Sequence, residues 1–72
     1  MSPVAPSPPR RTASGEVIVE FVQAGGFLRC VAVDVDTATE ASATGPVSAG
    51  RAALERIALG KLKRALAAQK SG

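Results

Sequence analysis

Residues 16–34 of the chain read EVIVEFVQAGGFLRCVAVD, two runs of β-branched and other apolar residues joined by Gly25-Gly26. Such runs are typical of β-strands, and a Gly-Gly pair can supply the positive φ angles of a two-residue hairpin turn. This turn places Phe21 opposite Cys30 and Glu20 opposite Val31. The segment therefore predicts an antiparallel hairpin with a defined register.

The sheet is expected to continue beyond the hairpin. Asp34-Val35-Asp36-Thr37 is a turn signal, because Asp side chains can bind nearby backbone N–H groups. Polar and Ala positions then alternate over residues 39–44, which predicts a weak third strand at the edge of the sheet. Gly45-Pro46 ends this strand, since Pro donates no hydrogen bond to a strand ladder.

The residues from Ser48 to about Gln69 have the pattern of an amphipathic helix, with Ser48 as the expected N-cap. Leu59 flanks an apolar stripe at helical spacing, which consists of Leu54, Ala58, Leu62, Ala65 and Leu66. Gly60 lies in mid-helix, where we expect it to be tolerated at a cost of about 1 kcal/mol. The predicted fold class is α+β, a three-stranded antiparallel β-meander followed by one long C-terminal helix packed on one sheet face.

Residues 1–15 hold four of the five prolines and no aromatic residue. They bury too little apolar surface to offset the entropy lost on ordering, so we expect a disordered Pro/Ser-rich tail. A single domain is expected over residues 16–70.

The composition argues against an enzyme. Only 17 of the 72 residues are Leu, Ile, Val or Phe, too few to wall a ligand pocket of about 300 Å³. The chain has no His and one Cys, which excludes a zinc finger and a His acid–base pair. Cys30 is expected to be a buried apolar thiol, and Asp34 and Asp36 to cap a turn. We therefore expect no catalytic residue, metal, cofactor or small-molecule substrate.

The same composition bears on location. One unpaired thiol suits a reducing compartment. Prolines interrupt the N-terminal segment, and no run approaches the roughly 18 apolar residues of a membrane span. We expect a cytoplasmic protein without a membrane span or an export signal.

Charge is distributed unevenly along the chain. The helical segment carries six Lys and Arg residues against Glu55, while residues 12–50 are acidic. On a helical wheel Arg56, Lys63 and Lys70 lie within about 40° of one another, with Arg64 further round. These four are the candidate anion-binding residues, for weak, sequence-independent contact with nucleic acid or for an anionic membrane surface. The alternative is a solubilising face, which the lack of Tyr and Trp for base stacking favours.

The second face of the hairpin is the other candidate site. One helix covers only one face of a sheet, and Glu20 and Arg29 mark the face that points outward. Its apolar residues are the candidate interaction face: Ile18, Val22, Phe27, Val31 and Val33. Monomers seldom expose such a patch, so we expect a protein partner or a homodimer, the alternative being a half-wet sheet.

The chain also resembles a known family. The run from Gly15 to Phe21, then Gly26, Asp34, the segment Thr39-Glu40-Ala41-Ser42 and Gly45-Pro46 before an Ala/Leu/Lys helix are similar to short bacterial proteins classed as a domain of unknown function. The resemblance covers roughly residues 15–68 and implies a fold without an activity. In this sequence Ala38 stands where the resemblance leads us to expect a turn Gly. The leading hypothesis is a non-catalytic interaction or accessory domain, and the alternative is a nucleic-acid or ribosome-associated binder.

Overall fold

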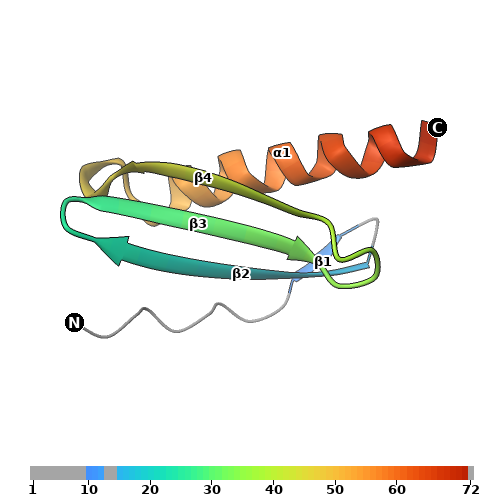
Figure 1. The fold of residues 1–72 in the computed structure, drawn as a ribbon, viewed down its shortest axis with the longest axis horizontal. Helices are drawn as coiled ribbons and strands as arrows, with labels where there is room; N and C mark the ends of the chain where they lie inside the picture. The colour runs from blue at the N-terminus through green and yellow to red at the C-terminus, as the bar shows by residue number, and fades with distance from the viewer. Residues whose placement is uncertain (1–9, 13–14, 72) are drawn as a thin grey trace.

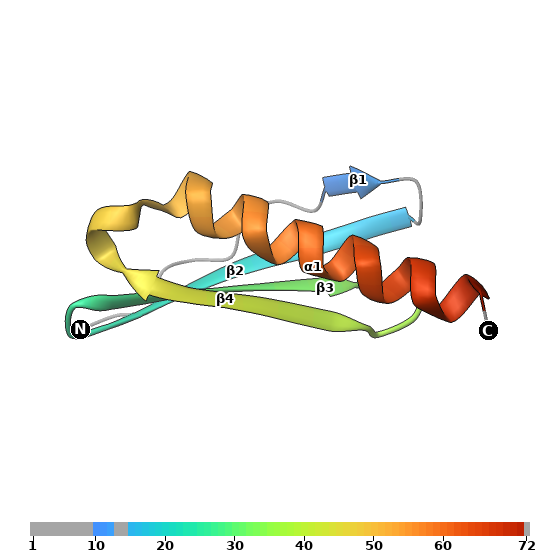
Figure 2. The same ribbon diagram turned by 90° about the horizontal axis from the view of Figure 1, so that it is seen from above.

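The structure of the protein, a computed structural model, describes residues 10–12 and 15–71, with side chains for residues 15–69. Four antiparallel strands lie side by side in chain order: β1 (Arg10–Thr12), β2 (Gly15–Ala24), β3 (Phe27–Asp34) and β4 (Glu40–Pro46). A short 3-10 helix, η1 (Val47–Ala49), leads into α1 (Arg51–Ser71). The helix runs along one face of the sheet (Figures 1 and 2). The predicted meander followed by a helix is confirmed, with β2, β3 and β4 as its three strands.

The hairpin has the predicted register. Phe21 pairs with Cys30 and Glu20 with Val31 across β2 and β3. The turn between these strands consists of Gly25 and Gly26, and Gly25 has the positive φ angle, 60°. Because side chains alternate along a strand, this register fixes which residues face the helix.

The third predicted strand is β4, and it lies at an edge of the sheet as expected. Pro46 is its last residue. The next residue, Val47, donates its backbone N–H to the carbonyl oxygen of Gly26 at 2.9 Å. This hydrogen bond holds the end of β4 against the hairpin turn.

β1 was not predicted. Residues 1–15 are expected to be a disordered tail, yet Arg10 pairs with Val17 and Thr12 with Gly15. The structure departs from the prediction at Arg10–Thr12 and at Gly15, which is the first residue of β2, because the unpaired edge of β2 offers hydrogen bonds that a Pro/Ser-rich composition does not reveal. For residues 1–9 and 13–14 the prediction lies outside the described residues.

The helix begins later than predicted. Ser48 is not its N-cap, because it lies within η1, and α1 starts at Arg51. Gly50 separates the two helices with a φ of 88°, and its carbonyl oxygen accepts the N–H of Leu54 at 3.4 Å. The chain thus turns at a glycine before the helix starts, rather than at a serine.

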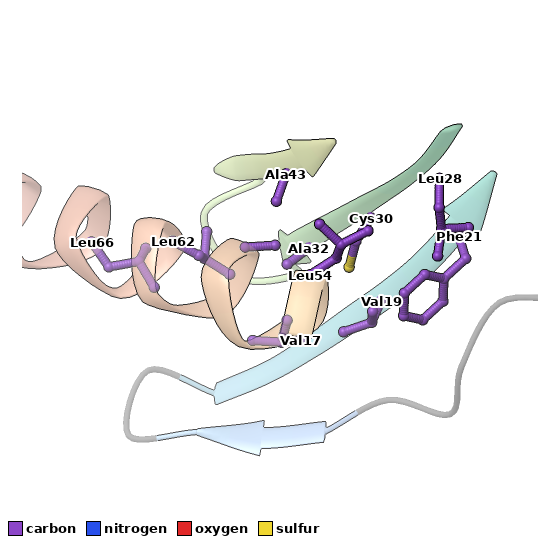
Figure 3. Packing of buried hydrophobic residues seen from close by; sticks show 11 residues of the cluster. Val17, Val19, Phe21, Leu28, Cys30, Ala32, Ala43, Leu54, Leu62 and Leu66 are labelled. Atoms are coloured by element: carbon purple, nitrogen blue, oxygen red, sulfur yellow. The ribbon is translucent and has the colours of Figure 1, made fainter. Parts of the chain in front are cut away.

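The core lies between α1 and the sheet. Figure 3 shows the helix leucines facing the strand residues. The buried apolar residues are those expected from strand and helix periodicity, except that Ala65 of the predicted stripe is only half-buried and Ala43 is added: Val17, Val19, Phe21, Leu28, Cys30, Ala32, Ala43, Leu54, Ala58, Leu62 and Leu66. A Cβ on Gly45 would lie 3.2 Å from Cδ2 of Leu54, so this glycine lets α1 approach β4 closely. Gly60 is exposed with open space around it, as expected for a tolerated glycine.

Candidate interaction face

The sheet has an outer face that α1 leaves uncovered. The helix packs on β3 and β4 from the side that carries the core. The residues of opposite parity on β2 and β3 point away from it, and they are the ones predicted: Ile18, Glu20, Val22, Phe27, Arg29, Val31 and Val33. We call this surface the outer face.

Two apolar side chains of the outer face are strongly exposed. Phe27 is 62% exposed and Val22 is 47% exposed. Ile18, Val31 and Val33 are half-buried by their neighbours within the sheet. All five predicted interaction residues therefore lie on one continuous surface.

The register arranges the outer face in rows across the strands. Phe27 lies between Ala24 and Pro46 at the hairpin end, and Val33 lies between Ile18 and Glu40 at the other end. The two middle rows hold the charges, because Arg29 pairs with Val22 and Glu20 pairs with Val31. The hairpin end of the face is thus apolar, the other end carries Ile18 and Val33 beside the exposed Glu40, and Arg29 and Glu20 lie diagonally opposed at the centre.

The predicted basic residues lie on the other side of the molecule, on α1. Arg56, Lys63 and Arg64 are exposed, and the side chain of Lys70 lies outside the described residues. Two further cations of the helix are engaged. Lys61 donates from Nζ to the carbonyl oxygen of Ser42 at 3.1 Å, and the Arg51 guanidinium lies 5.6 Å from the centroid of the Phe21 ring.

The turn between β3 and β4 is built around a buried carboxylate. Asp34 is 0% exposed, and its Oδ2 accepts from the backbone N–H of Thr37 at 3.0 Å and from its Oγ1 at 2.7 Å. Its Oδ1 has no hydrogen-bond partner among the described atoms. The predicted capping role is therefore correct, but the full burial was missed. Strand parity could have revealed it, because Asp34 shares the inward alternation of Cys30 and Ala32.

Cys30 occupies the buried position that the sequence predicts, in the core. Where side chains are described, no group of three or more His, Cys, Asp or Glu residues could hold a metal ion. Among the described residues, no helix is both long enough and apolar enough to cross a membrane.

The comparison with protein families gives one match. Residues 14–70 match the family described as Domain of unknown function (DUF6898). The chain belongs to this family. The match takes in the strands from β2 onward and nearly all of α1, so the whole outer face lies within the family domain. No curated protein and no solved structure matches the chain.

Proposed function

We propose that the protein is a non-catalytic interaction domain that binds a protein partner on its outer face. The observation that carries this proposal is the exposure of Phe27 and Val22 beside three half-buried aliphatic residues on one uncovered sheet face. Burying an apolar side chain completely is worth about 1.5–3 kcal/mol, so covering Phe27 and Val22 alone gains on the order of 2 kcal/mol. A cytoplasmic location, which the single cysteine favours, is part of the proposal.

The arrangement of the outer face suits a protein better than a small ligand. It runs along two long strands, and its apolar side chains lie on both sides of the central Arg29 and Glu20. Protein interfaces likewise combine apolar side chains with a few charges that fix the orientation of the partner. A small molecule is instead bound in a concave site that surrounds it.

The experiment is site-specific photo-crosslinking in the cells that produce the protein. A photoreactive phenylalanine analogue at position 27 is expected to give a discrete adduct with protein. The matched control position is Ile57, which is 50% exposed but lies on α1. No adduct from position 27, or the same adducts from both positions, would contradict the proposal.

A second candidate function is weak binding of nucleic acid by α1. It is favoured by the exposure of Arg56, Lys63 and Arg64, for none of which the structure shows an ion pair with another described residue. Phosphate contacts by these cations would be salt-sensitive and independent of sequence. Replacing Arg56 and Lys63 with Gln is expected to weaken RNA binding and to flatten its salt dependence. Unchanged affinity would eliminate this candidate.

A further inference from the structure

We infer that the partner on the outer face is a second copy of this chain, packed sheet against sheet with its strands antiparallel to those of the first. This inference rests on the proposed function and names the partner. The two-fold axis lies midway between the two sheets, parallel to them and perpendicular to the strands. It passes over β3 at the point between Arg29 and Val31. Under this two-fold the outer face is complementary to itself.

The two-fold exchanges the rows of the outer face from end to end. The row of Phe27 comes to lie over the second copy's row of Val33, and the two middle rows lie over each other. Phe27 then covers Val33 of the other copy, and Ile18 covers its Ala24. On β4, Thr44 faces the second copy's Ser42, two small side chains that permit close approach of the sheets.

The charges are paired by the same operation. Arg29 of one copy is placed over Val31 of the other, and Val31 is the cross-strand neighbour of Glu20. Adjacent strands are about 4.8 Å apart, so the guanidinium lies within side-chain reach of that carboxylate. The symmetry repeats the pair, which gives two Glu20–Arg29 contacts between the copies. Within one chain the structure shows no ion pair between these two residues, although both are described.

Other ways of joining two copies fit the outer face less well. A two-fold axis parallel to the strands would place Arg29 on Arg29, and like charges in close contact are unfavourable. Pairing through the free edge of β4 meets the Lys61 ammonium, which already binds the Ser42 carbonyl oxygen at that edge. A charged side chain at an edge strand is a common obstacle to edge-to-edge pairing.

The size of the outer face indicates how strong the dimer is. Three strands span about 14 Å across and about 24 Å along the ladder, roughly 340 Å² per copy in projection, which is below the size of stable interfaces and typical of weak, transient ones. We therefore expect dissociation on the order of a hundred micromolar. Two twisted sheets can pack in this way with their strands within about 30° of each other.

The experiment uses charge reversal and analytical ultracentrifugation of the full chain. E20R alone and R29E alone each place like charges at both contacts, so each is expected to dimerise at least tenfold more weakly than the wild type. An equimolar mixture of the two variants restores opposite charges and is expected to form the heterodimer with near wild-type affinity. The double variant E20R/R29E is expected to form a homodimer again. Glu20 and Arg29 are both exposed, so these variants should fold, and circular dichroism verifies this.

The matched control is R56E, which makes the same charge change on α1. It should dimerise like the wild type. A heterodimer of R56E with E20R keeps one Glu20–Arg29 contact and one contact between like charges, so it should be weaker than the heterodimer of E20R with R29E, in which both contacts join opposite charges. A mixture of E20R and R29E that stays as monomeric as its components overturns the inferred packing. If F27D still abolishes dimerisation in that case, the outer face remains the interaction surface in another register. A wild type that stays monomeric at several hundred micromolar overturns the second copy as partner, and the crosslink from position 27 then decides the proposed function separately.

Discussion

The side-chain amide of Gln69 donates a hydrogen bond to Oγ1 of Thr39 at 2.7 Å, across 30 positions of sequence. It joins the far end of α1 to the turn between β3 and β4. The turn is itself ordered by Thr37, whose single hydroxyl proton goes to Asp34 and whose Oγ1 accepts a hydrogen bond from Oγ1 of Thr39 at 2.8 Å. The C-terminal end of the helix is therefore connected to Asp34 through two threonines.

Replacing Gln69 with Ala should loosen this connection. The bond is exposed to solvent, so we expect a loss of about 0.5–1 kcal/mol in the free energy of unfolding, measured by urea denaturation. R64A is the matched control, because Arg64 is also exposed on α1 and the structure shows no bond for it to another described residue. Equal losses in both variants would show that the hydrogen bond contributes nothing specific.

Replacing Ala38 with Gly should stabilise the protein. Ala38 has a φ of 59°, in the left-handed region that costs an L-residue roughly 1–2 kcal/mol. Glycine avoids this strain but loses more chain entropy on folding, so we expect a net gain of about 0.5–1 kcal/mol. Thermal or urea unfolding measures it.

The control for that prediction is the same chemical change in a helix. Ala52 is exposed in the first turn of α1, where A52G should instead cost up to about 1 kcal/mol. Destabilisation by A38G as well would mean that the positive φ of Ala38 carries no strain.

Replacing Gly15 with Ala should destabilise the start of β2 for two reasons. Gly15 has a φ of 123°, and a Cβ at this position would collide with Oδ2 of Asp36. We expect a loss of about 1–3 kcal/mol in urea unfolding, because both the backbone and the Asp36 side chain must move. D36G removes the carboxylate with which the new Cβ collides. The loss in free energy of unfolding caused by G15A should therefore be smaller in the D36G background than in the wild type. A G15A variant as stable as the wild type would refute this prediction.

Replacing Asp34 with Ala should be the most damaging of these changes to the turn. It removes the acceptor of both Thr37 bonds in a fully buried position, which should cost about 2–3 kcal/mol in the free energy of unfolding. D34N keeps one oxygen for the same two donors and should retain most of the stability. If D34N and D34A unfold at the same urea concentration, the hydrogen bonds to Thr37 are not what Asp34 contributes.

The sequence predicts best what is determined locally. Gly25-Gly26 sets the register of β2 against β3, and period-two alternation then assigns every residue of the outer face. The presence of Glu20 and Arg29 indicated which face the helix leaves open. These three observations together place Ile18, Val22, Phe27, Val31 and Val33 on the outer face, where the structure has them.

What escaped prediction depends on contacts distant in sequence. β1 is only three residues long and exists through pairing with β2, so its own composition carries no strand signal. Ser48 is a good N-cap by residue type, but the constraint that fastens Val47 to Gly26 leads the chain into η1 first. The burial of Asp34 was overlooked because an acidic residue at a turn is usually solvated.

Because Cys30 is fully buried, the reactivity of its thiol reports how often the folded state opens. Its thiol is the single one in the sequence, and a reagent can reach the sulfur only when α1 separates from the sheet. The rate at which an alkylating probe modifies the protein therefore measures the opening of the folded state. The measurement works in a crowded lysate as well as in a pure solution. Oxidative damage to this thiol would accumulate in molecules that had already opened, marking them chemically.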